Sequence, residues 1–260
     1  MRLLQREGVR VIFPEGQSCC GQPAYNAGYR DEARAVASAQ LRVLSRDIPV
    51  VVPSGSCAGM LRHHYPYLFA GTAEQERAQA LASRTHEFSA FQVETLEVRL
   101  EDRGPPCRVA LHGSCSARRE VGAVGAAESL LDQLRGVTRV EFDHSTECCG
   151  FGGTFSVKQP EISAAMAKDK TQAIRASGAD ALVSQDCGCL MHLGGTFARQ
   201  GHGPEIRHLA EFLWERVRER AGAGWYLYHV GDEPPTQPAD AEQVETFLRE
   251  VDKLLRAEHK

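Results

Sequence analysis

The sequence lacks the features by which several classes of protein are recognised. It has no stretch approaching about 18 consecutive apolar residues, the length of a membrane-spanning helix. Its opening, MRLLQREGVRVIF, has neither the apolar core nor the small-residue cleavage site of a secretory signal. It also has no Lys/Arg-rich run, and the net charge of −4 is mildly acidic. We therefore expect a soluble, cytoplasmic protein with no transmembrane segment and no nucleic-acid partner.

Two common cofactor motifs are missing as well. No Gly-x-Gly-x-x-Gly fingerprint follows a predicted strand, and the Gly152-Gly153 pair does not make one. The Cys-x-x-Cys-x-x-Cys run of ordinary ferredoxins does not occur either. We therefore expect no flavin or NAD of its own, and no ferredoxin-type cluster held by this chain.

What the chain has in quantity is cysteine, with 9 among its 260 residues. A reducing cytosol disfavours structural disulfides and the count is odd, so metal binding is the leading explanation. Buried structural cysteines usually lie inside apolar runs, and the cysteines of this chain do not. Cys107 alone begins a predicted strand. The others all lie where an apolar strand pattern gives way to Gly, Ser or Asp: Cys19, Cys20, Cys57, Cys115, Cys148, Cys149, Cys187 and Cys189.

These cysteines recur in an internal repeat. VRVIFPEGQSCCG at residues 9–21 resembles TRVEFDHSTECCG at residues 138–150: a β-rich run, a polar turn, then Cys-Cys-Gly. After each copy comes a helix-compatible stretch and then another strand that ends at a cysteine. The predicted helices cover 31–46 and 160–177, and the predicted strands cover 48–57 and 180–189.

The second copy also has an earlier strand, residues 107–115, which ends at Cys115 and leads into a predicted helix over 119–135. The equivalent cysteine of the first copy would fall before Met1, and residues 2–7 resemble the end of the helix that would follow it. Two explanations stay open: a truncated or misassigned start, and a first site that is naturally incomplete.

Strands that alternate with helices of this length indicate an α/β fold with parallel sheets. We predict two pseudo-repeated, Rossmann-like βαβ units with the cysteine loops at the carboxyl ends of the strands, where ligands gather in such sheets. The expected divisions are a first repeat with a mostly helical connector over residues 60–106, a second repeat, and a linker with a surface helix. Their bounds are 1–103, 104–221 and 222–260.

The spacing of the cysteines favours an iron-sulfur cluster over zinc. Structural zinc usually takes two local pairs of ligands. Here the adjacent Cys148 and Cys149 combine with cysteines far along the chain on either side. Adjacent thiolates diverge from a bent backbone, so they more readily contact different atoms of a polynuclear cluster than one small ion. A zinc-stabilised scaffold without redox activity stays the alternative.

Four strings in the sequence resemble a known family. They are PEGQSCCGQPAYNAGY at 14–29, PSGSCAGM at 53–60, HGSCSARRE at 112–120 and ECCGFGGTFSVK at 147–158. They are similar to the cysteine-rich CCG-domain iron-sulfur oxidoreductases, and within these to the lactate-utilisation A group. The cysteine-rich subunit of heterodisulfide reductase and the glycolate oxidase iron-sulfur subunit are further members. The resemblance spans roughly residues 1–217.

The resemblance implies an oxidoreductase subunit that oxidises L-lactate to pyruvate with two partner subunits, one of them carrying ferredoxin-type clusters. It implies a 4Fe-4S cluster, of noncubane type in relatives, at each complete cysteine set. The second set would be Cys115, Cys148, Cys149 and Cys189, with Cys187 as a further candidate, and the first set would retain Cys19, Cys20 and Cys57. The missing first cysteine and the Cys-Gly-Cys at 187–189 depart from the family pattern. A glycolate oxidase or heterodisulfide reductase type of subunit stays the alternative within the family.

Other residues near the cysteines have both a functional and an ordinary interpretation. Gly21, Gly150, Gly152 and Gly153 would let backbone N–H groups approach cluster sulfur, or would simply form turns. His112, His144 and His192 are candidates for contact with the ligands, although histidines are common at strand ends and turns. Lys158 could offset the negative charge of a cluster, or lie in solvent at the start of a helix.

Overall fold

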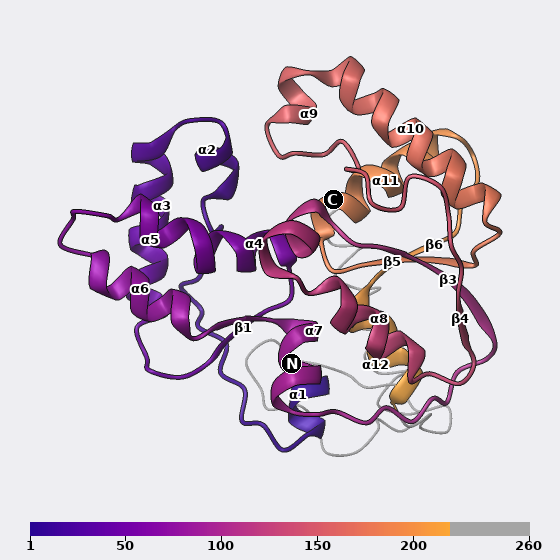
Figure 1. Cartoon of the computed structure of the whole chain (residues 1–260), viewed down its shortest axis with the longest axis horizontal. Helices are drawn as coiled ribbons and strands as arrows, with labels where there is room; N and C mark the ends of the chain where they lie inside the picture. Colours follow the sequence, from indigo (N-terminus) through magenta and orange to yellow (C-terminus); the bar gives the residue numbers. More distant parts are fainter. Residues whose placement is uncertain (219–260) are drawn as a thin grey trace, which may run out of the picture. The chain divides into compact units, whose positions relative to one another are not determined.

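The computed structural model describes residues 1–218 (Figure 1). Residues Met1–Val217 form one compact unit. The linker and surface helix expected over residues 222–260 lie outside the described residues. The predicted boundary between the two repeats stays a prediction.

The second repeat contains a four-stranded parallel sheet with the order β4-β3-β5-β6. Because the chain passes from β3 to β4 on one side and then to β5 on the other, the strand order reverses at β3. The strands are β3 (Cys107–His112), β4 (Val137–Arg139), β5 (Ala181–Ser184) and β6 (Glu205–His208). The helices are η3 (Ala117–Val121, π-helical), α8 (Val124–Asp132), α9 (Phe155–Lys158), α10 (Pro160–Ala176), α11 (Cys187–Arg199) and α12 (Leu209–Val217).

Helices cover both faces of this sheet, and the side chains of the strands alternate between them. Val109, Ala181 and Val183 belong to the buried cluster that includes residues of α8 and α12. Ala110 and Leu182, the intervening residues, belong to the cluster that includes residues of α10 and α11. Strands buried on both faces explain the continuous apolar runs in the sequence.

The first repeat contains a two-stranded parallel sheet, in which Val50 to Val52 pair with Thr85 to Glu87. Before the sheet lie α1 (Arg2–Arg6), α2 (Gln22–Asn26) and α3 (Arg30–Val43). The sheet and its connection consist of β1 (Val50–Val52), α4 (Gly55–Gly59), η1 (Met60–His64, π-helical), α5 (Tyr65–Leu68), α6 (Gln75–Ser83) and β2 (Thr85–Glu87). They are followed by α7 (Phe88–Ala90) and η2 (Phe91–Thr95, π-helical).

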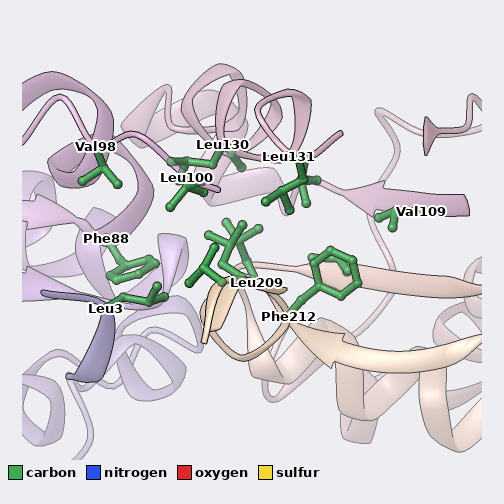
Figure 2. Close-up of a cluster of buried hydrophobic side chains, with 14 of the residues drawn as sticks. Leu3, Phe88, Val98, Leu100, Val109, Leu130, Leu131, Leu209 and Phe212 are labelled. Carbon is green, nitrogen blue, oxygen red and sulfur yellow. The ribbon is translucent and has the colours of Figure 1, made fainter. Parts of the chain in front are cut away.

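One apolar core joins the two repeats (Figure 2). Leu3 of α1 and Phe88 of α7 come from the first repeat, whereas Leu130 of α8 and Leu209 of α12 come from the second; all four are at most 4% exposed. A fully buried side chain of this size contributes about 1.5–3 kcal/mol, so the shared core is a large part of the stability of the unit. The two repeats are therefore not independent folding units joined by a linker.

The predicted α/β fold with parallel sheets is confirmed, but several local predictions are corrected. The strands predicted over 48–57 and 180–189 end at Val52 and Ser184, so Cys57 and Cys189 lie in α4 and α11. Residues 9–13 form no strand. The predicted connector, residues 60–106, is mostly helical as expected, but it also contains β2, which completes the first sheet. The helix predicted over 119–135 is interrupted at Gly122, whose φ of 72° ends η3 before α8 begins.

Within the part of the chain that the structure describes, no helix has both the length and the apolarity needed to cross a bilayer.

Candidate metal centre

The second cysteine set lies at the carboxyl ends of three neighbouring strands. Cys115 follows β3, Cys148 and Cys149 lie in the loop after β4, and Cys189 lies in the first turn of α11, directly after β5. The strand order reverses between β3 and β5, and the carboxyl ends of the strands at such a reversal are where parallel sheets usually bind ligands. The topology thus brings together cysteines that are far apart in the sequence.

The four thiols of this set form one connected chain. The Sγ atoms of Cys149 and Cys189 are 3.1 Å apart, and Cys148 is hydrogen-bonded to both Cys115 and Cys149. Backbone amides also face the sulfurs: Gly150 N lies 3.3 Å from Cys148 Sγ, and Phe151 N lies 3.5 Å from Cys149 Sγ. All of these cysteines are free thiols.

The thiols of this set differ in pKa. Hydrogen bonds from the Cys115 and Cys149 thiols lower the pKa of Cys148, against the opposing effect of burial. A hydrogen bond from Cys149 likewise lowers the pKa of Cys189, again against burial and with help from nearby His112. Two thiolates are therefore favoured within this set, and the thiolate is the form that binds metals.

His112 is a further polar group beside these thiols, which the sequence predicted only as a candidate for contact with the ligands. It ends β3 and is fully buried, and a ring nitrogen lies within 4.8 Å of the Sγ atoms of Cys149 and Cys189. Its Nε2 has no hydrogen-bond partner among the described residues. A buried polar atom without a partner is costly unless a ligand satisfies it, so this nitrogen marks a place for a bound group.

Lys170 of α10 holds the loop that carries Cys148 and Cys149. Its Nζ donates to the carbonyl oxygens of His144 at 2.6 Å and Glu147 at 2.7 Å, and it lies 3.5 Å from His112 Nδ1. Because an ammonium group can only donate, Nδ1 is the acceptor and the proton of a neutral His112 is on Nε2. The sequence shows Lys170 only as one of several charged residues in an amphipathic helix, so no pattern distinguished it.

The first set repeats part of this arrangement. Cys20 Sγ donates to Cys57 Sγ at 3.4 Å, and this bond lowers the pKa of Cys57 against the effect of burial. Gly21 N lies 3.4 Å from Cys19 Sγ, as Gly150 does from Cys148. The buried Tyr65 hydroxyl donates to Cys20 O at 2.9 Å and fixes this turn. The structure therefore brings Cys20 and Cys57 into direct contact beside Cys19, which is exposed.

The carboxylate of Asp186, which is only 3% exposed, joins the two sets. It is the N-cap residue of α11, yet Oδ1 accepts from Ser56 N at 3.0 Å and Ser56 Oγ at 2.6 Å, in the first turn of α4. Oδ2 accepts from Ser114 Oγ, and Ser114 Oγ in turn accepts from Ala117 N. One side chain thus links the helix starts that carry Cys57, Cys115 and Cys189.

Other candidates from the sequence lie apart from the two thiol sets. Cys187 is exposed at the start of α11, and burial and then the charge of Asp186 raise its pKa, with a smaller contribution from Cys57. His144 pairs with Glu147 at 2.7 Å, and His192 lies 3.1 Å from Ser163 Oγ. Lys158 lies over the ring of Tyr29, with Nζ 5.2 Å from its centroid.

The donors present fit a thiophilic metal centre. The second set offers four connected sulfurs, amide N–H groups beside two of them, and a buried imidazole nitrogen without a partner among the described residues. Soft thiolates select iron-sulfur clusters or zinc among biological metals, and amide hydrogen bonds to sulfur are a usual feature of cluster sites. The ligand role of Cys115, Cys148, Cys149 and Cys189, and of Cys19, Cys20 and Cys57, stays a prediction.

The fold and these thiol sets define a cysteine-rich α/β protein in which two related units each present a Cys-Cys-Gly turn. In agreement, the family model described as "Cysteine-rich domain", CCG, matches residues 1–62 and 109–194.

Three relatives are each named lactate utilization protein A. The protein of Shouchella clausii is 44% identical over 216 residues, 82% of this chain and 89% of the relative. That of Geobacillus sp. strain WCH70 is 43% identical over 219 residues (83% and 91%), and that of Halalkalibacterium halodurans is 41% identical over 221 residues (84% and 91%). The chain therefore belongs to the lactate utilization protein A family of cysteine-rich-domain proteins.

Proposed function

We propose that this chain is an iron-sulfur electron-transfer subunit of a complex that oxidises L-lactate to pyruvate. One observation carries the proposal: four connected thiols lie beside a His112 nitrogen that has no partner among the described residues. The chain that holds them is 44% identical to a lactate utilization protein A over 82% of its length. The chemistry of the site supports electron transfer, and the similarity supports lactate as the substrate of the system.

The reaction has two parts that need not take place on one chain. Oxidation of lactate to pyruvate releases two electrons and two protons. A bound iron-sulfur cluster would supply one-electron acceptance and release. Toward that group, the thiolates of Cys148 and Cys189 would be ligands and the Gly150 amide would donate to sulfur. Burial of the site would exclude water.

We further propose a 4Fe-4S cluster at the second set, with Cys115, Cys148, Cys149 and Cys189 as its ligands. Cys19, Cys20 and Cys57 would form a first site. The name shared by the relatives implies a lactate utilization system, and we propose partner subunits of this chain in it, one of them with ferredoxin-type clusters. We propose the cytoplasm as the location of the complex.

Metal analysis of the protein purified without oxygen tests the cofactor. We expect iron and acid-labile sulfide in similar amounts, with a broad visible absorbance that dithionite bleaches. The Cys149→Ser variant should lose the part of the iron that belongs to the second site, whereas Cys107→Ser, at the start of β3 and away from both sets, should keep all of it. Zinc without sulfide would contradict the proposal and support the zinc scaffold.

Growth on lactate tests the substrate. A deletion of the gene should abolish growth on lactate in a host without another lactate dehydrogenase, and the wild-type gene and Cys107→Ser should both restore it. Cys149→Ser should not restore growth. A deletion strain that grows on lactate but fails on glycolate would contradict the lactate assignment while leaving the cluster assignment intact.

A further inference from the structure

The two repeats hold their Cys-Cys-Gly turns in the same way. Gly21 and Gly150 have φ values of +85° and +87°, and each faces a backbone carbonyl of the following long helix. A Cβ atom at Gly21 would lie 3.2 Å from Ala33 O, and one at Gly150 would lie 2.7 Å from Ser163 O. These contacts align α3 with α10, residue by residue. Gln40 and Lys170 each lie seven residues beyond those carbonyls and are therefore equivalent.

The equivalent residues both donate to the residue before the Cys-Cys pair, but they differ in charge. Gln40 Nε2 donates to Ser18 Oγ at 2.8 Å, and Ser18 directly precedes Cys19 and Cys20. Lys170 Nζ donates to Glu147 O at 2.7 Å, and Glu147 directly precedes Cys148 and Cys149. Gln40 is 4% exposed and Lys170 is 1% exposed. A neutral amide is thus sufficient to anchor the turn, so anchoring alone does not explain a lysine in the second repeat.

The surroundings of Lys170 fit a charged ammonium group. The partners of Nζ are the carbonyl oxygens of His144, Ser145 and Glu147 and the Nδ1 atom of His112, all of which can act as acceptors. A neutral amine has only two N–H groups for these partners, whereas an ammonium group has three. A buried cation with neutral partners is costly unless an anion lies nearby, and a thiolate-bound cluster supplies that anion.

We propose that Lys170 is a charge-compensating residue that makes a cluster at the second site easier to reduce. The inference rests on the proposed function, since it requires a cluster at that site. Reduction adds one electron to the cluster from an external donor and leaves every bond and proton in place. The added negative charge is stabilised by the nearby ammonium group, whereas an amide at this position, as in the first repeat, offers no such charge.

The test is a redox titration of the full-length protein, purified without oxygen and followed by electron paramagnetic resonance. The signal of the second site is the one that Cys149→Ser lacks. The variant Lys170→Gln copies the first repeat, and Lys168→Gln removes an exposed lysine from the same helix as a matched control. We expect the equilibrium constant for reduction to fall roughly tenfold in Lys170→Gln, which is about 59 mV for one electron. Lys168→Gln should leave the potential unchanged.

Each outcome decides the inference. An unchanged potential in Lys170→Gln, with iron and sulfide at wild-type levels, overturns it and leaves the proposed function standing. Wild-type protein without iron or sulfide overturns the proposed function and the inference with it. If Lys170→Gln loses its cluster, Lys170→Arg decides: a retained cluster with the wild-type potential supports a role for the charge. If Lys170→Arg also loses the cluster, the inference is overturned, because the site would then require the shape of the lysine side chain and not its charge alone.

Discussion

Ser54 donates a hydrogen bond of 2.8 Å to the carboxylate of Asp186, 132 positions further along the chain. The two residues are structural equivalents: Ser54 is the N-cap residue of α4 after β1, and Asp186 is the N-cap residue of α11 after β5. The pseudo-symmetric ends of the two sheets thus meet at Asp186, which also accepts from Ser56. Cys57 and Cys189 each lie three residues beyond these caps, so the hydrogen-bonded pair of caps directly precedes a cysteine of each set.

Replacing Asp186 should therefore weaken both sites. In Asp186→Asn an NH₂ group replaces one carboxylate oxygen and faces serine donors, so at least one of the hydrogen bonds to Ser54, Ser56 or Ser114 is lost. We expect a loss of about 2–4 kcal/mol in the free energy of unfolding, since hydrogen bonds to charged groups contribute about 1.5–3 kcal/mol each. Urea unfolding and iron analysis measure the two effects.

Asp180→Asn is the matched control for this substitution. Asp180 is exposed before β5, and its carboxylate accepts a bond of 2.7 Å from Arg108 N. It should cost at most about 1 kcal/mol and leave iron unchanged. Equal losses in the two variants would refute the coupling role of Asp186.

The glycine after the second Cys-Cys pair should tolerate no side chain. Gly150 has a φ of +87°, and a Cβ atom there would lie 2.7 Å from Ser163 O. Gly28, with a φ of +86°, has no atom within 4 Å of the same position. Both Gly→Ala variants carry the strain of a left-handed residue, about 1–2 kcal/mol, but only Gly150→Ala must also move α10 away from the turn.

We accordingly expect Gly150→Ala to lower the thermal midpoint more than Gly28→Ala and to lose iron, whereas Gly28→Ala should retain iron. Thermal unfolding followed by circular dichroism, together with iron analysis, separates the two variants. If both retain full iron, the close contact with Ser163 O has no consequence for the site.

The internal repeat made much of this fold predictable from the sequence. The Cys-Cys-Gly strings predicted which cysteines would converge, because parallel strands deliver their carboxyl ends to one edge of a sheet. The strand β2 was not predictable, since Thr85-His86-Glu87 is short and polar and pairs only because Val50 to Val52 lie beside it.

The β-rich run at the start of the first copy forms no strand, and this has a different physical reason. In the second repeat β4 pairs with β3, and the described residues of the first repeat include no counterpart of β3 with which this run could pair. A β-prone sequence without a neighbouring strand gains no ladder hydrogen bonds. The sequence predicted His112 as one of three histidines that could contact the ligands, and the structure places it beside Cys149 and Cys189. The roles of Lys170 and Asp186 could not be predicted, because each acts through contacts with residues distant in the chain.

Cys187 and Cys189 should differ in their need for the cluster, although they are two residues apart. By the alignment of the N-cap residues Ser54 and Asp186, Cys189 is equivalent to Cys57, whereas Cys187 is equivalent to Gly55. Cys187 is exposed, and Cys189 is 8% exposed and 3.1 Å from Cys149. We expect Cys189→Ser to lose the second-site iron and Cys187→Ser to keep it. Iron loss in Cys187→Ser would make Cys187 a ligand and would require α11 to begin differently in the loaded protein.

The buried ion pair between Asp102 and Arg216 should make stability depend on pH in a defined range. Arg216 Nη2 lies 2.6 Å from Asp102 Oδ2, and Nε lies 2.7 Å from Oδ1, with side-chain exposures of 6% for Arg216 and 2% for Asp102. Burial alone would raise the pKa of Asp102, but the bonds from Arg216 and from the Gly104 and Gly136 amides outweigh it and lower that pKa. The pair joins the segment before β3 to α12, one of the helices of the shared core.

A carboxyl whose pKa is depressed in the folded state contributes stability above its unfolded pKa of about 3.9, and this contribution is lost as the pH falls through the folded pKa. Asp102→Asn leaves Arg216 buried and uncompensated, so we expect a loss of about 3–5 kcal/mol near pH 7. The difference in the free energy of unfolding between Asp102→Asn and wild type should stay constant down to about pH 5 and become smaller below about pH 4. Urea unfolding at about pH 7, 5 and 3.5 measures it.

The control variant is Glu205→Gln, which removes a partner of Arg207 at the surface and should cost less than about 1 kcal/mol in the free energy of unfolding. A gap between Asp102→Asn and wild type that widens as the pH falls below about 4 would contradict this assignment, because the wild-type carboxylate would then gain rather than lose its contribution on protonation.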